Sequence, residues 1–107
     1  MPSPGDVVTV SFPGARGTKR RPAVVVSSDI YHNERPDLIL GILTMNLSSA
    51  TASTDYVLQD WSAAGLHSAS AFRSYFGMAL PTDVHVVGQL STRDWQAVKG
   101  CVTRAFA

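Results

Sequence analysis

Two β-branched runs on either side of a glycine-containing basic segment constrain the fold most strongly. Residues 6–12, DVVTVSF, alternate their side chains between two faces, as a β-strand does. Pro13 and Gly14 interrupt such a pattern, so we expect this strand to end at residue 12. Because Pro22 has no N–H to donate to a sheet, it belongs at the start of a strand. We therefore expect the second strand to begin at Arg21 or Pro22.

The segment between these strands holds much of the positive charge. Gly14 and Gly17 predict an open, mobile hairpin loop over residues 14–20. Four of the nine Lys and Arg residues lie within six positions: Arg16, Lys19, Arg20 and Arg21. Alternation along the second strand places Arg20 and Arg21 on opposite faces. In a chain of net charge +1, so local a patch fits a small anionic target, such as a few phosphates.

The rest of the chain predicts further strands and one terminal helix. We expect strands at residues 38–46, with a bend or bulge at Gly41, and at residues 54–59, 70–76 and 83–90. The sequence DWSAAGL before residue 67 predicts a short helical turn. Ser91 and Asp94 resemble a capping box, and an apolar stripe follows at helical spacing. This pattern predicts a mainly β fold with a C-terminal helix, a small SH3-like barrel built from a strongly bent antiparallel sheet.

Length and composition limit the class of protein. The 107 residues are enough for a single domain, residues 1–107, with a core of its own. No apolar run approaches the ~20 residues that span a bilayer, and the N-terminus lacks the pattern of a signal peptide. A lone cysteine, Cys101, forms no internal disulfide and fits a small buried position on the helix. We therefore expect a cytoplasmic protein.

Several segments together resemble the MazF/PemK/Kid family of toxin endoribonucleases. They are GDVVTVSFP, the basic loop, RRPAVVVSSDIYHN, and the apolar strand that ends in Leu43-Thr44. The resemblance is close over residues 5–46 and looser through WSAAGL, GQLS and the terminal helix. It implies a CcdB/MazF-type barrel that forms a homodimer in the bacterial cytoplasm. It also implies cleavage of single-stranded RNA (mRNA) at short motifs, with no metal or other cofactor, and an antitoxin partner that blocks the groove.

The resemblance also assigns residues. It places the catalytic arginine, immediately before the proline, on Arg21 and the catalytic threonine on Thr44. It places substrate binding on the basic loop and just after the threonine: Gly14, Arg16, Gly17, Thr18, Lys19, Arg20 and Asn46.

The chemistry is consistent with these residue types. In RNA the 2′-hydroxyl can attack the adjacent phosphorus, giving a 2′,3′-cyclic phosphate and a 5′-hydroxyl. The protein then supplies alignment and stabilisation of negative charge. An arginine fork holds two phosphate oxygens, and a threonine hydroxyl is well aimed because its χ1 is stiff. The pattern identifies no general acid or base: His32, His67 and His85 fit loop or surface roles, although His32 has some chance of bordering the groove.

Other interpretations stay open at this point. Arg21 can anchor its strand through Asp6, Thr44 can be an ordinary strand residue, and the loop cations can simply be solvated. The aromatic residues Phe12, Trp61 and Trp95 fit the core better than base stacking. A different class of function is a non-catalytic toxin, similar to the CcdB relatives that trap DNA gyrase, using Trp95 and Phe106 on the terminal helix. A third is a barrel without catalysis that binds RNA or a peptide, which Met45 after the threonine leaves open.

Overall fold

One antiparallel sheet organises the protein. A computed structural model describes residues 1–14 and 17–107, and the side chains of residues 12–18 lie outside that description. Six strands pair in the order β4-β5-β3-β2-β1-β6. The strands are β1 (Asp6–Gly14), β2 (Gly17–Val25), β3 (Leu38–Thr44), β4 (Tyr56–Val57), β5 (Ala71–Ala79) and β6 (Val84–Gln89). The helices are α1 (Asp29–Glu34) and α2 (Thr92–Ala105), with 3-10 turns η1 (Leu47–Ser49) and η2 (Pro81–Asp83).

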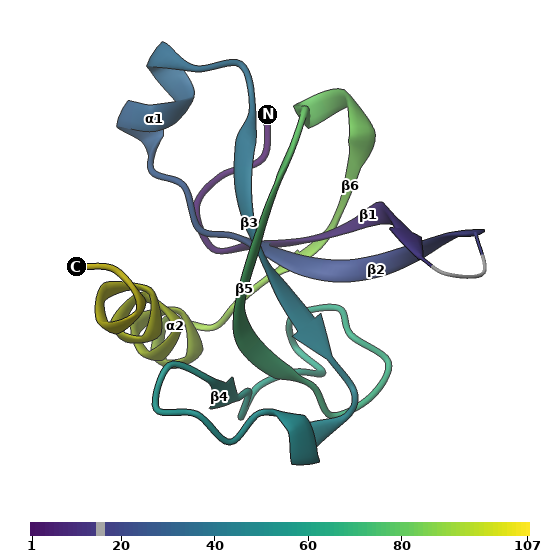
Figure 1. The fold of residues 1–107 in the computed structure, drawn as a ribbon, viewed down its shortest axis with the longest axis vertical. Coiled ribbons are helices and arrows are strands. Elements are labelled where there is room, and N and C mark those ends of the chain that lie inside the picture. The colour runs from purple at the N-terminus through teal and green to yellow at the C-terminus, as the bar shows by residue number, and fades with distance from the viewer. Residues whose placement is uncertain (15–16) are drawn as a thin grey trace.

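The sheet is strongly curved. Three strands separate β5 from β6 in the sheet, so four strand spacings, ~19 Å, would lie between them if it were flat. Residues 80–83 alone connect them, and three of these form η2, which rises only about 2 Å per residue. The two strands therefore approach each other at this end (Figure 1). Within the described residues β4 and β6 do not pair, so the predicted bent sheet is confirmed and it is not closed.

Both faces of the central strands bury apolar side chains. The cluster inside the curve contains residues of β1, β2, β3 and β6: Val8, Val10, Ala23, Val25, Leu38, Leu40 and Val84. The opposite face packs against α2 and the segment before β5: Val7, Val24, Leu43, Leu58, Ala64, Phe72, Leu90, Val98 and Cys101. Alternating side chains of β1 and β2 thus enter two different clusters. The expected burial of Cys101 on the helix is confirmed.

The hairpin of β1 and β2 differs from the expectation. Both strands are longer than predicted, and the ladder continues to the pair Gly14 and Gly17. The prediction of an open loop over residues 14–20, with the second strand starting at Arg21 or Pro22, is therefore wrong. Because Pro22 lies opposite Thr9 and only β1 pairs with this part of β2, the missing N–H does not prevent the strand from starting earlier. The hairpin projects on one side of the molecule, away from both helices (Figure 1).

Other elements were predicted with mixed success. The predicted irregularity near Gly41 is confirmed, since the β3–β5 register shifts between Gly41 and Leu43. A Cβ at Gly41 would collide with the Phe72 ring, so only glycine allows this approach. The strand expected at residues 54–59 shrinks to the two residues of β4. The sequence did not predict α1, which begins after the N-cap Ser28 in a segment that reads as a turn.

Asp94 in the first turn of α2 links the helix to the chain before β5. Ser91 caps the helix by accepting a hydrogen bond from the Asp94 N–H, as the capping box predicts. The Asp94 carboxylate, however, accepts from the Tyr56 hydroxyl at 2.7 Å and from the N–H groups of Gln59 and Asp60 at 3.1 and 2.8 Å. Asp94 is fully buried. Burial and the hydrogen bond to Asp94 raise the pKa of Tyr56 to about 12.

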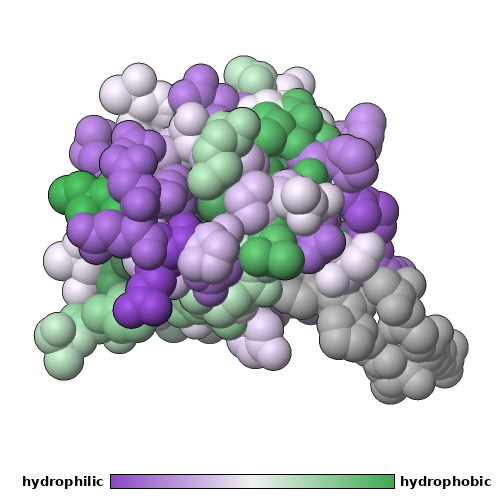
Figure 2. Space-filling view, turned by 90° about the horizontal axis from the view of Figure 1, so that it is seen from above, coloured by the Kyte–Doolittle hydropathy of each residue, from purple (hydrophilic) through white to green (hydrophobic). Residues whose placement is uncertain are grey.

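The surface mixes polar and apolar residues. In Figure 2 the apolar residues on the face seen from above form separate patches between polar ones. The exposed apolar residues with the largest exposed fractions are Met1, Ile30, Met45, Tyr75 and Phe106. In the described part of the chain, neither helix has the length and apolar character needed to cross a bilayer.

Replacing Asp94 with alanine should lower the free energy of unfolding by about 3 kcal/mol, because three donors lose the buried carboxylate that accepts from them. Asp94→Asn keeps the shape and one acceptor oxygen, so its loss should be smaller. Urea denaturation measures the free energy of unfolding of both variants. The control is Gln96→Ala on the exposed face of α2, which should change that free energy by about 0.5 kcal/mol or less. Equal stabilities of Asp94→Ala and the control would contradict this role for Asp94.

Acid should weaken the contact between the segment before β5 and α2. Hydrogen bonds from Arg93 at 2.8 Å and from Ser91 at 2.6 Å lower the pKa of Asp60 to about 2. A carboxylate with a lowered pKa stabilises the fold above its ordinary pKa near 4, and this contribution disappears as the pH falls toward 2. The urea midpoint of the native protein should therefore fall more steeply between pH 4 and pH 2 than that of Asp60→Asn. Parallel curves would contradict the assignment.

Candidate functional site

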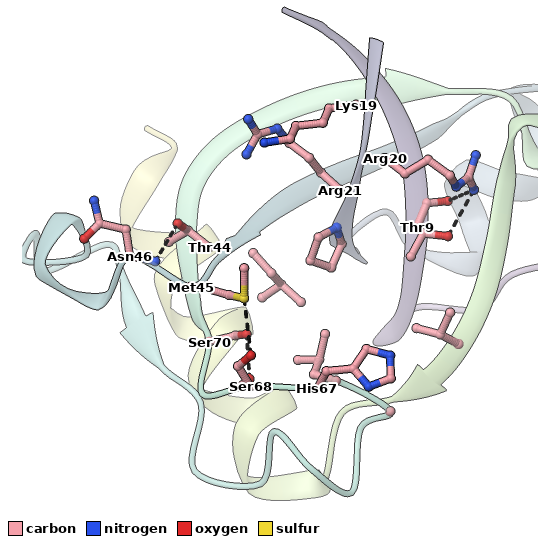
Figure 3. Close-up of a pocket in the computed structure, with 15 residues that line it drawn as sticks. Thr9, Lys19, Arg20, Arg21, Thr44, Met45, Asn46, His67, Ser68 and Ser70 are labelled. Atoms are coloured by element: carbon pink, nitrogen blue, oxygen red, sulfur yellow. Dashed lines mark hydrogen bonds between the residues drawn. The ribbon is translucent and has the colours of Figure 1, made fainter.

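A cavity of about 430 Å³ opens between β2, the end of β3 and the chain before β5. Its described lining comes from five parts of the fold (Figure 3). They are Lys19, Arg20, Arg21 and Pro22 of β2; Leu43, Thr44, Met45 and Asn46 at the end of β3; Gly65, Leu66, His67, Ser68 and Ser70 before β5; and Thr9 and Val87. The described lining residues include three cations and no carboxylate.

The cavity begins where β2 and β3 stop pairing. Their ladder ends at the pair Ala23 and Ile42. The same register, continued by two residues, sets Arg21 opposite Thr44. Pro22 lies between Arg21 and the ladder, and it has no N–H with which to extend the pairing. The two residues singled out as catalytic therefore lie on two walls of one cavity.

Arg20 and Arg21 occupy opposite faces of β2, as the alternation predicts. The Arg20 guanidinium donates to the carbonyl and the hydroxyl oxygen of Thr9, both at 3.0 Å, and to the Ser11 hydroxyl at 3.2 Å. These bonds hold Arg20 along β1. Figure 3 shows the side chains of Lys19 and Arg21 extending on the other side of the strand.

Arg21 has an exposed side chain with no hydrogen bond or ion pair to the residues that the structure describes. The alternative anchor, Asp6, accepts instead from the Ser3 N–H at 2.8 Å. An arginine fixed to a strand with its donors unused can hold two oxygens of an anion. Among the described residues, Arg21 therefore does not anchor its strand through Asp6.

Thr44 presents a hydroxyl whose proton is available. Its Oγ1 accepts a hydrogen bond from the Asn46 N–H at 3.1 Å, so the O–H itself can donate to a ligand. The Asn46 side chain accepts from the Ser48 hydroxyl at 2.7 Å. Met45 is 69% exposed and accepts from the Ser68 hydroxyl through its sulfur at 3.3 Å. Met45 therefore connects the end of β3 to the segment before β5 at the rim of the cavity.

The helical turn predicted at DWSAAGL is confirmed, but sequence reasoning missed that the chain from this turn to β5 forms a wall of the cavity. Residues 60–66 form a single helical turn, in which the Ala64 N–H donates to the Asp60 carbonyl at 3.3 Å. This turn lies directly on β6, because a Cβ on Gly65 would collide with the Val87 carbonyl and a Cβ on Gly88 with that of Ala64. It directs His67 and the residues after it to the cavity. The small residues in this stretch were the only sign in the sequence of such close packing.

The predicted site residues divide into three groups. Arg21, Thr44, Lys19, Arg20 and Asn46 line the cavity. Gly14, Gly17 and Thr18 lie farther out on the hairpin, where Gly14 pairs with Gly17 and Thr18 with Pro13. Arg16 lies outside the described residues.

The other predicted candidates lie away from the cavity. His32 contacts the buried Ser27 hydroxyl at 2.5 Å and is not among the described lining residues, so it does not border the cavity. Trp61 and Trp95 pack against the core, as expected. The Phe12 side chain lies outside the described part. In the described part of the chain, no three His, Cys, Asp or Glu side chains gather as metal ligands.

Comparison with solved structures places this fold among toxins and endoribonucleases. An endoribonuclease in complex with its cognate antitoxin, from a Mycobacterial species, has a TM-score of 0.78 at 13% identity, covering 98% of this chain and 94% of that one. The Mycobacterium tuberculosis toxin MazF-mt6 has a TM-score of 0.74 at 14% identity, with coverage of 94% and 95%. A MazE-MazF structure from Deinococcus radiodurans gives 0.70 at 17% identity, with coverage of 97% and 93%. These likenesses establish the fold.

Sequence comparison establishes the family. None of the curated proteins matches the chain. The family model described as the PemK-like, MazF-like toxin of type II toxin-antitoxin systems matches residues 3–106. This match extends the resemblance seen in residues 5–46 to nearly the whole chain. The protein therefore belongs to the PemK/MazF family of type II toxin-antitoxin toxins.

Proposed function

We propose that this toxin is a metal-independent, sequence-selective endoribonuclease that cleaves single-stranded RNA. The observation that carries the proposal is the position of Arg21 and Thr44 on facing walls of one cavity. Their roles are inferred from this arrangement and from the chemistry of their side chains. The volume of about 430 Å³ is within the range of ligand sites and has room for a nucleotide unit.

The charge of the cavity favours a polyanion. The three cations Lys19, Arg20 and Arg21 all line the cavity, and no described lining residue is acidic. The two arginines differ in freedom, because Arg20 is held by Thr9 while Arg21 donates to no residue that the structure describes. We infer that Lys19 and Arg20 bind phosphates on either side of the reacting one. Arg21 would hold the reacting phosphate itself.

The reaction proceeds by transfer within the RNA. The 2′-oxygen attacks the adjacent phosphorus, the bond to the 5′-oxygen breaks, and the products carry a 2′,3′-cyclic phosphate and a 5′-hydroxyl. The Arg21 fork stabilises the negative charge that grows on the non-bridging oxygens. The Thr44 hydroxyl, oriented by the Asn46 N–H, donates to the 2′-oxygen or to a phosphate oxygen and fixes the direction of attack.

The partners follow from the same cavity. One of the similar structures is an endoribonuclease in complex with its cognate antitoxin, and another is a MazE-MazF structure. We infer that a cognate antitoxin covers the wall of Lys19, Arg20 and Arg21 in this protein and excludes RNA. We also infer that the protein acts as a homodimer in the bacterial cytoplasm. Two cavities acting together can bind a longer stretch of RNA than one.

The test is incubation of the protein with a long RNA of mixed sequence in EDTA, followed by mapping of the new ends. Cleavage at a short recurring motif is expected, with cyclic phosphate and 5′-hydroxyl ends. Arg21→Ala should reduce the rate by about 10²-fold or more, as expected for a lost preorganised donor. Thr44→Val keeps the branched shape without the hydroxyl and should also cut slowly.

Arg73→Ala is the matched control, because Arg73 is an exposed arginine on β5 outside the described lining of the cavity. Its rate should equal that of the native protein. Intact RNA with folded, antitoxin-free protein would contradict the proposal. Trapped complexes of gyrase and cleaved DNA without RNA cutting would support the gyrase-binding alternative, for which Phe106, 61% exposed, is the available aromatic.

A further inference from the structure

We propose that His67 is the general acid of this cavity and protonates the 5′-oxygen as it leaves phosphorus. The inference rests on the proposed RNA cleavage and adds the proton donor that neither Arg21 nor Thr44 supplies. Arginine remains protonated in proteins, and a threonine hydroxyl is a very weak acid. A leaving alkoxide needs a proton from a group that exchanges it near neutral pH.

His67 has the position that this role requires. Figure 3 shows His67 on the wall opposite the cations of β2, with Thr44 on a third side of the same cavity. Entering and leaving oxygens lie in line on opposite sides of phosphorus. If Thr44 directs the 2′-oxygen and Arg21 holds the phosphate, the leaving oxygen points away from Thr44 toward the wall of His67.

The backbone before His67 is firmly placed. Gly65 has φ +86 and packs against the Val87 carbonyl of β6. The Leu66 N–H donates to the Trp61 carbonyl at 3.3 Å. Through Asp60 the same turn is bonded to the buried Asp94 carboxylate. His67 is exposed, so its imidazole is accessible to RNA. The backbone that carries it is held in place, as is required of a group that must donate a proton to one particular oxygen.

The surroundings of His67 are cationic or neutral. The charged groups that line the same cavity are Lys19 and Arg21 on one face of β2 and Arg20, held by Thr9, on the other. Thr9 of β1 and Val87 of β6 carry no charge. Among the described lining residues, His67 is the only histidine, the residue type that most often transfers a proton in catalysis.

Cleavage exchanges one phosphorus–oxygen bond for another and moves two protons. The bond between the 2′-oxygen and phosphorus forms, and the 2′-hydroxyl proton passes to water. The bond between phosphorus and the 5′-oxygen breaks, and the 5′-oxygen takes the proton of the His67 imidazolium. The neutral imidazole then regains a proton from solvent, and no electrons are transferred. Since the protonated imidazole is the active form, the rate should fall as the pH rises.

The experiment compares the cleavage rates of the native protein, His67→Ala and His67→Gln on a mapped RNA from pH 5 to 9. His85→Asn is the control, since His85 is an exposed histidine on β6 outside the described lining. At pH 6 the cleavage rate of both His67 variants should be about 10²-fold below that of the native protein. Their rates should also no longer fall as the pH rises. A second RNA carries sulfur in place of the 5′-oxygen at the cleaved bond. Because a thiolate leaves without a proton, this RNA should restore the variants to within about tenfold of the native rate.

The outcomes separate the two proposals. Native cleavage with an unchanged rate or pH profile in His67→Ala would overturn the role of His67 and leave the nuclease assignment intact. A loss that the sulfur substrate does not restore would also overturn it, because the defect would then lie elsewhere than in leaving-group protonation. No cleavage by the native protein would refute both.

Discussion

The end of the β2–β3 ladder at Ala23 and Ile42 is the feature on which the site depends. Strands that stayed paired would bring Arg21 and Thr44 into one flat ladder with no space between them. Pro22 has no N–H to extend the pairing, while β2 continues along β1, where Thr9 holds Arg20. The separation of the two strands therefore creates a cavity with a cationic strand on one wall and a hydroxyl on another.

The third wall depends on a buried carboxylate that is not among the described lining residues of the cavity. Asp94 on α2 orders the chain at Gln59 and Asp60, and the turn that follows rests on β6 through Gly65 and Gly88. Buried charges are costly unless they are satisfied, and here three donors satisfy one carboxylate. The first turn of α2 thereby supports residues that line the cavity, which couples the stability of this end of the fold to the geometry of the cavity.

Local patterns predicted the parts of the fold that depend on local physics. Period-two alternation identified residues 6–12 as a strand, and Ser91 marked the start of α2 because capping involves neighbours in sequence. Gly41 indicated a bend, and its reason, the Phe72 ring, is a long-range contact. The hairpin was predicted too short because the effect of a proline depends on which strand faces it.

The site divides in the same way between residues that the sequence pattern indicates and residues that only long-range contacts place. The resemblance placed Arg21 and Thr44, and alternation separated Arg21 from Arg20. Nothing local indicated that Asp94 would bond across about 35 residues to the chain before β5, or that His67 would reach the same cavity. The short helix α1 was missed because its N-cap at Ser28 lies in a sequence typical of turns.

The central claim is that the RNA supplies its own nucleophile between Arg21 and Thr44. The most direct measurement uses an RNA that contains one mapped cleavage site and a single 2′-deoxynucleotide on the 5′ side of that bond. The account predicts that this bond stays intact while the RNA still binds, with a Kd close to that of the all-ribose strand. Cleavage at the deoxy position at the native rate would contradict it.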